Sequence, residues 1–135
     1  KGYRLWGTDI HTEYSPSESG LNFSVKMNKG NFIGKSSLEK TSEEAPKRSL
    51  SCLVLDNPSH LVMGKEPIIY KEKRVGYVTS ANYGYTTGKS IAYGYLPANL
   101  NNPGQTLKIQ YFGQSYSATV SEEPLYDPKM EKLRN

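Results

Sequence analysis

The stretch Val75–Pro97, with the sequence VGYVTSANYGYTTGKSIAYGYLP, constrains the fold most. Residues 75–80 and 91–96 each alternate with a period of two, which places successive side chains on opposite faces of a strand. β-Branched and aromatic residues, which suit a pleated surface, recur in both runs. Pro97 ends the second run because it has no N–H to give to a neighbouring strand. The stretch therefore predicts two antiparallel strands joined as a hairpin.

The connection between these strands, residues 80–89, contains residues that tolerate positive φ. Asn82, Gly84 and Gly88 predict a hairpin connection longer than two residues. The run Gly84–Ser90 also looks like a phosphate-binding loop, but three residues separate its glycines where that loop has four. A strand is also predicted where that loop needs a helix. We therefore interpret these glycines as turn and close-packing residues.

The same periodicity predicts further strands at Arg48–Leu55, Pro67–Tyr70, Thr106–Phe112 and Ser115–Ser121. A polar turn at 72–74 joins the strand that ends at Tyr70 to the hairpin. The eleven tyrosines also favour a β-rich fold. Short strands separated by Gly, Pro and Asn turns are typical of a small antiparallel barrel or sandwich.

The residues before the first strand predict a short α/β appendage. Ser15 and Glu18 match a capping box at the start of a short helix. Leu21–Met27 alternates as a strand does, and Asn31 begins a second helix that we expect to run to about Glu44.

The chain divides at the polar segment around Pro46. We expect residues 1–45 to be the tail of one domain and residues 46–135 to be the β domain. The opening KGYRLWG resembles the middle of an element, so we expect the chain to be part of a longer polypeptide. Residues 123–135 predict a polar tail that extends over the surface.

Charge, hydropathy and cysteine content argue against several function classes. The net charge of +4 comes from lysines scattered along the chain, which is typical of a solvated surface and disfavours a nucleic-acid partner. No apolar run approaches the roughly 18 residues of a membrane span. The one cysteine, Cys52, lies in an apolar run and predicts a buried thiol in a reducing compartment.

The residues also contain no evident catalytic or metal-binding set. His11 and His60 lack the paired spacing of metal ligands. Nothing marks Asp9 or Glu13 as a general acid or base, and no base stands next to Cys52 in the sequence. We therefore expect no catalysis by this chain alone.

Short motifs in register cover nearly the whole chain: Tyr3–Asp9, Ser15–Leu21, Asn31–Lys35, Val75–Ser80, Gly88–Ala92 and Gly94–Pro97. In this order they resemble the C-terminal part of the glycine cleavage T-protein (aminomethyltransferase) family. Arg-x-Trp-Gly at the start and EPLYDPK near the end are closer to its dimethylglycine and sarcosine dehydrogenase branch than to the simple T-protein.

That resemblance implies a mainly β fold, in which the tail of a folate-binding middle domain precedes a small six-stranded antiparallel barrel. It also implies an enzyme that moves a one-carbon unit from an N-methylated amino acid to tetrahydrofolate. The catalytic carboxylate and the FAD domain would lie upstream of Lys1, in domains of the same polypeptide that share the folate channel. The implied location is the cytoplasm, or the mitochondrial matrix for a eukaryotic source.

Three residues near the start are the candidate cofactor-binding residues. The resemblance places Trp6 in the wall of the folate channel, with Tyr3 and Arg4 nearby. The alternatives are that Trp6 anchors a core and that Arg4 pairs with Asp9 or Glu13.

Three other functions remain open at this point. The first is that the longer polypeptide is a flavin-free aminomethyltransferase. A Gly-x-Gly-x-x-Gly segment upstream of Lys1 would exclude this possibility, because that motif is typical of a dinucleotide-binding domain. Small barrels with exposed tyrosines also bind single-stranded nucleic acid, although this sequence predicts no basic groove. The third possibility is a structural domain with no ligand contact.

Overall fold

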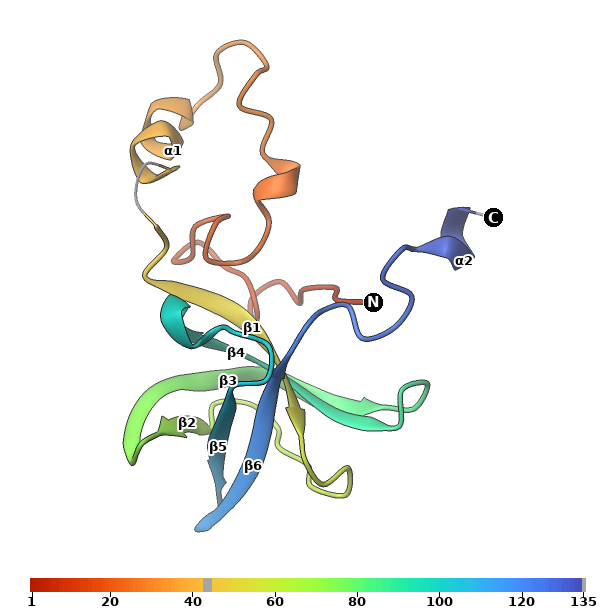
Figure 1. Ribbon diagram of the computed structural model, residues 1–135. Helices are drawn as coiled ribbons and strands as arrows, with labels where there is room; N and C mark the ends of the chain where they lie inside the picture. Colours follow the sequence, from red (N-terminus) through yellow and green to blue (C-terminus); the bar gives the residue numbers. More distant parts are fainter. Residues whose placement is uncertain (43–44, 135) are drawn as a thin grey trace.

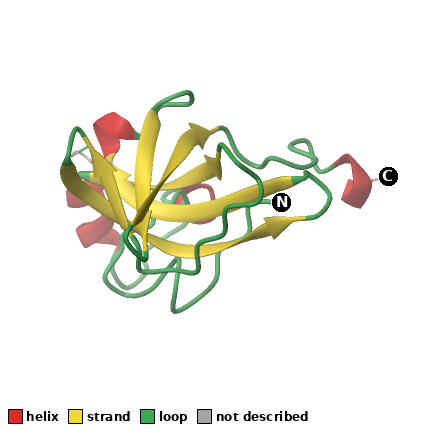
Figure 2. Cartoon of the chain, turned by 90° about the horizontal axis from the view of Figure 1, so that it is seen from below, coloured by secondary structure: helices red, strands yellow, loops and turns green. Residues whose placement is uncertain are grey.

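The computed structural model describes residues 1–42 and 45–134, and its strands close into an antiparallel barrel (Figure 1). The strand order around the barrel is β1-β4-β3-β2-β5-β6, and the expectation of a six-stranded antiparallel barrel is confirmed. The strands are β1 Arg48–Leu55, β2 Pro67–Tyr70, β3 Lys73–Gly84, β4 Lys89–Pro97, β5 Thr106–Tyr111 and β6 Gln114–Ser121. Figure 2 shows these strands curving around one another, with the C-terminal helix standing away from them.

Side chains from alternate positions of the strands fill the barrel. Leu53 and Leu55 of β1 are buried there, and so are Leu107 and Ile109 of β5. Their regular alternation with outward residues is why the period of two predicted these strands with nearly the observed bounds. Cys52 points to the other face of β1 and is still buried, because other parts of the chain cover that face.

The hairpin of β3 and β4 is confirmed, but its strands are longer than predicted. β3 continues to Gly84, so only residues 85–88 form the connection. On β4 the small residues Ala92 and Gly94 face the interior, because the backbone of β3 and the side chain of Ile68 lie too close for larger ones. The aromatic face of this strand points outward.

The turn between β2 and β3 lies at Lys71 and Glu72, not at 72–74. Both residues have left-handed φ values, of 48° and 62°. Two consecutive left-handed residues match the right-handed twist of paired strands, so Lys73 already belongs to β3.

The appendage differs from the prediction. The Ser15–Glu18 capping box forms, but residues 16–20 make turns and no α-helix. A 3-10 helix, η1 (Asn22–Ser24), stands where Leu21–Met27 was expected to be a strand. That prediction was wrong because a strand needs hydrogen-bonding partners, and the sheet pairings of the described residues include none for this run.

The helix α1 (Lys35–Ser42) starts later than expected, since Asn31 and Ile33 precede it as loop and turn. The predicted end at Glu44 lies outside the described residues. Figure 1 shows α1 and the loops around it projecting away from the barrel.

The remaining short helices lie near the C-terminal half. A second 3-10 helix, η2 (Ala98–Leu100), follows β4, and α2 (Glu131–Arg134) forms near the end of the chain. The tail is therefore not extended throughout, as the sequence analysis had expected. None of the described helices is long and apolar enough to cross a membrane.

Candidate functional site

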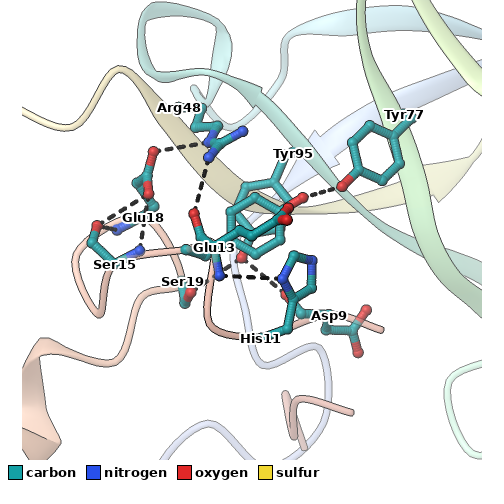
Figure 3. Close-up of polar contacts among 10 residues, drawn as sticks. Asp9, His11, Glu13, Ser15, Glu18, Ser19, Arg48, Tyr77 and Tyr95 are labelled. Carbon is teal, nitrogen blue, oxygen red and sulfur yellow. Dashed lines mark hydrogen bonds and ion pairs between the residues drawn. The ribbon is translucent and has the colours of Figure 1, made fainter. Parts of the chain in front are cut away.

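The candidate site is the N-terminal segment, residues 3–20, which docks on the outer faces of β1, β3 and β4 (Figure 3). Its first part is a tight loop. The carbonyl of Leu5 accepts the amides of Asp9 at 2.8 Å and Ile10 at 3.2 Å, and the amide of Gly7 donates to the carbonyl of Ile10 at 2.8 Å. Gly7 has φ of +84°, which favours glycine in this loop.

The loop Leu5–Ile10 has one buried side and one exposed side. Asp9 is only 2% exposed, whereas Trp6 is 70% exposed. Trp6 is therefore not a core anchor of this chain, and that alternative from the sequence analysis is wrong.

Asp9 attaches the loop to the barrel. Its Oδ1 accepts hydrogen bonds from Thr79 Oγ1 at 2.6 Å and Ser80 Oγ at 2.7 Å. Its Oδ2 accepts the amide of Leu5 at 2.9 Å, and its backbone carbonyl accepts the hydroxyl of Tyr95 at 2.9 Å. Because hydrogen bonds to a carboxylate offset the cost of burying it, this residue is a structural anchor and not an exposed acid or base.

The second part of the segment rests on an aromatic cluster. Tyr14 stacks on Tyr95 of β4, and its hydroxyl hydrogen-bonds to that of Tyr77 of β3. The guanidinium of Arg48 lies over the Tyr14 ring, 4.5 Å from its centroid. Burial raises the pKa of Tyr14 well above its usual range, and it also raises the pKa of Tyr95. Both phenols are therefore neutral hydrogen-bonding groups at physiological pH.

Glu18 completes the attachment. Its carboxylate accepts the amide of Ser15 at 3.0 Å and the Nε of Arg48 at 2.8 Å. Burial disfavours the charged form of Glu18, but these bonds outweigh it and hold the pKa of the carboxyl below its usual value. The capping-box glutamate thus ties the segment to the start of β1.

Arg4 has a different partner from the two that were predicted. Its guanidinium pairs with the carboxylate of Glu123, and it lies over the ring of Tyr93 at 5.2 Å from the centroid. Asp9 accepts bonds from β3 instead, and the backbone carbonyl of Glu13 accepts from Arg48. The prediction of an Arg4 pair with Asp9 or Glu13 is wrong because it used sequence proximity, whereas folding brings residue 123 beside residue 4.

The outward face of the segment is aromatic and borders a hollow. Tyr3 is 68% exposed, and it lines a hollow of about 720 Å³ together with Phe23, which is 75% exposed. Lys1, Lys129 and Arg134 line the same hollow, and so does the Arg4–Glu123 pair. The structure therefore places exposed aromatic rings beside a rim that is mostly cationic.

Two residues of this site were missed by the sequence analysis. Asp9 was dismissed because nothing nearby in the sequence marks it, and its hydroxyl partners lie 70 and 71 positions away. Phe23 was assigned to the wrong element. The alternation of its run gave no signal that the ring is exposed, because the missing strand partner is visible only in the structure.

The comparisons with known proteins agree with this architecture. The model of the glycine cleavage T-protein C-terminal barrel domain matches residues 48–127. Dimethylglycine dehydrogenase, mitochondrial, from Mus musculus is 40% identical over 126 residues, which are 93% of this chain and 14% of that protein. An aminomethyltransferase from Rippkaea orientalis is 37% identical over 123 residues, which are 90% of this chain and 33% of that protein.

A solved structure shows the same fold. The glycine cleavage system aminomethyltransferase T from Bartonella henselae superposes with a TM-score of 0.87 at 22% identity, covering 94% of this chain and 36% of that one. This chain thus spans about a seventh to a third of the length of the proteins it matches. The barrel, its strand order and the family match together show that the chain belongs to the glycine cleavage T-protein C-terminal barrel family, related to dimethylglycine and sarcosine dehydrogenases and to aminomethyltransferases.

Proposed function

We propose that this chain forms one wall of a tetrahydrofolate site in a longer enzyme that demethylates an N-methylated amino acid. The observation that carries the proposal is the exposure of Trp6, at 70%, on a loop whose opposite side is anchored by a buried carboxylate. A large apolar ring held in solvent by a hydrogen-bonded loop is suited to contact a planar ligand or another domain.

The side chains around the loop fit a pterin ring joined to an acidic tail. Trp6 and Tyr3 offer exposed rings for stacking, and Phe23 adds a third beside Tyr3. Tetrahydrofolate, when bound, would accept the one-carbon unit. The chain's own residues would orient it and exclude water from one side. A direct contact of Arg4 with folate stays a prediction, and it requires Arg4 to leave Glu123.

Other parts of the same polypeptide would complete the enzyme. The match covers 14% of the mouse dehydrogenase, so most of that protein lies outside the matched region and can form further domains. We assign the acid or base of the reaction and the FAD of the parent enzyme to those domains. We also propose the mitochondrial matrix as the location for a eukaryotic source, because the related mouse dehydrogenase is named mitochondrial, and the cytoplasm otherwise.

A flavin-free aminomethyltransferase is the second candidate for the parent enzyme. It is favoured by the Rippkaea orientalis relative, which is 37% identical over 90% of this chain. The absorbance spectrum of the purified full-length polypeptide distinguishes the two candidate enzymes. A flavin band that stays with the protein supports the dehydrogenase, and a spectrum without that band supports the aminomethyltransferase.

The folate proposal is tested by titrating the full-length polypeptide with tetrahydrofolate in a calorimeter. Trp6→Ala and Tyr3→Ala are expected to weaken binding by roughly tenfold or more, the effect of losing one stacked ring. Phe112→Ala removes a ring that is 90% exposed at the turn between β5 and β6, and it serves as the matched control. Unchanged affinity in Trp6→Ala would overturn the assignment of Trp6.

A further inference from the structure

The backbone of β3 is irregular where Asp9 contacts it. The register of β3 against β4 shifts between Val78 and Ser80, which is a β-bulge. Side chains of adjacent strand residues normally point to opposite faces, and a bulge breaks that alternation. Here the hydroxyls of Thr79 and Ser80 both reach the same oxygen, Asp9 Oδ1, at 2.6 and 2.7 Å. The bulge thus creates a paired hydroxyl site for one carboxylate.

The other oxygen of Asp9 acts inside the loop. Oδ2 accepts the amide of Leu5, the residue that precedes Trp6. The carbonyl of the same Leu5 accepts the amides of Asp9 and Ile10. Both the N–H and the C=O of Leu5 are therefore hydrogen-bonded within the loop. Because Trp6 is the next residue, these bonds also fix where its backbone lies.

We propose that Asp9 is the positioning residue for Trp6: through the bulge hydroxyls and the Leu5 amide it fixes the backbone that carries the ring, and so restricts the ring that is proposed to contact folate. This inference rests on the proposed function. Asp9 is 2% exposed and lies on the opposite side of the loop from the ring, so it acts through Trp6 and does not contact the ligand. The bulge in β3 then contributes to the binding site indirectly, because it holds Asp9 and makes no contact with the ligand itself.

The substitution Asp9→Asn weakens both halves of this contact. An asparagine is uncharged and has one acceptor oxygen where Asp9 has two, so the Leu5 amide and the hydroxyls of Thr79 and Ser80 can no longer all donate to this side chain as they do to Asp9. Thr79→Val is milder, because it removes one barrel hydroxyl and keeps both acceptor oxygens.

Mobility is measured first, by time-resolved fluorescence anisotropy of this 135-residue chain, in which Trp6 is the only tryptophan. Asp9→Asn is expected to release the ring into fast local motion, and Thr79→Val to do so partly. Asp56→Asn is the matched control, since Asp56 accepts a bond from Thr119 at the surface of the barrel. Circular dichroism and the urea midpoint show that each variant is folded. Trp6 motion that is unchanged in folded Asp9→Asn would overturn the proposal, and Thr79→Val tests it if Asp9→Asn does not fold.

Folate affinity is measured next, in the full-length polypeptide. Asp9→Asn is expected to weaken tetrahydrofolate binding by roughly tenfold, a loss of the size that a broken charge-assisted hydrogen bond causes. The double variant with Trp6→Ala is expected to bind no more weakly than Trp6→Ala alone, because both changes act through one ring. Additive losses would overturn the proposal. If Trp6→Ala alone binds folate normally, the proposed function fails, while the anisotropy still decides whether Asp9 positions the loop.

Discussion

The ring of Tyr14 lies on the ring of Tyr95, with the centroids 3.7 Å apart and the planes inclined by 17°. Tyr14 belongs to the N-terminal segment and Tyr95 to β4, so the stack joins the appendage to the barrel wall. Arg48 covers the Tyr14 ring from β1 and also bonds to Glu18. The segment is therefore held by stacking and charge together, and the Tyr95 hydroxyl also donates to the carbonyl of Asp9 in the loop that presents Trp6.

Replacing Tyr14 by alanine is expected to lower the free energy of unfolding by about 2–3 kcal/mol, because a half-buried ring loses its stack and its cation contact. Urea unfolding followed by circular dichroism measures the change. Tyr14→Phe keeps the stack and loses only the Tyr77 bond, so we expect a cost of about 1 kcal/mol. Equal losses for the two variants would show that the hydroxyl, and not the ring, holds the segment.

Glu18 makes stability depend on pH in the acid range. Its pKa in the folded chain lies below its usual value of 4.5, so its contribution is fully present above the unfolded-state pKa and is lost as pH falls through the folded-state pKa. Glu18→Gln is expected to cost about 1 kcal/mol at pH 7. The difference from wild type should disappear once the pH falls below the folded-state pKa, where Glu18 is protonated. Urea midpoints measured across this range test the prediction, with the exposed Glu122→Gln as control. A gap between wild type and Glu18→Gln that persists at the lowest pH would contradict it.

Gly76 is required by the close approach of β3 and β4. A Cβ added there would lie 2.0 Å from the carbonyl oxygen of Tyr95, a backbone atom that has no room to move. Gly76→Ala is expected to lower the free energy of unfolding by about 3 kcal/mol or more. At Gly30 an added Cβ meets nothing within 4 Å, so Gly30→Ala is the matched control and should leave thermal stability nearly unchanged. Similar melting temperatures for the two variants would show that the barrel wall does not require glycine at position 76.

Cys52 is expected to be unreactive while the chain is folded. Burial raises the pKa of its thiol to about 11, and the nearby Glu123 carboxylate adds to the rise. At pH 8 its thiolate fraction is therefore about a hundredfold below that of a free cysteine. A colorimetric disulfide reagent should label it slowly in buffer and rapidly in denaturant. Rapid labelling of the folded chain would show that the outer face of β1 is open.

The strands were predictable because each carries its own signal. β1 and β2 have the bounds that alternation predicted, and the inward residues of β5, Leu107 and Ile109, are those that share a face in the sequence. A strand buried in a barrel needs apolar residues at every second position, so local pattern and tertiary environment agree.

The appendage shows where local pattern fails. Leu21–Met27 has the alternation of a strand, yet it forms a short 3-10 helix, because pairing depends on a partner that the run itself does not encode. The Ser15–Glu18 hydrogen bonds form as the capping box predicts, but Gly20, with φ of +69°, follows too soon for a helix to continue.

The amino-acid sequence alone determined the barrel strands, the turn glycines, the burial of Cys52 and, through its motifs, the family. Only the tertiary structure decided the site. The pairing of Arg4 with Glu123 and the anchoring of Asp9 by Thr79 and Ser80 each join residues 70 or more positions apart. The exposure of Trp6 follows from the docking of its loop on the barrel. Periodicity reports which face of an element a side chain occupies, whereas such contacts depend on how separate elements pack and on a bulge that shifts the register of one strand.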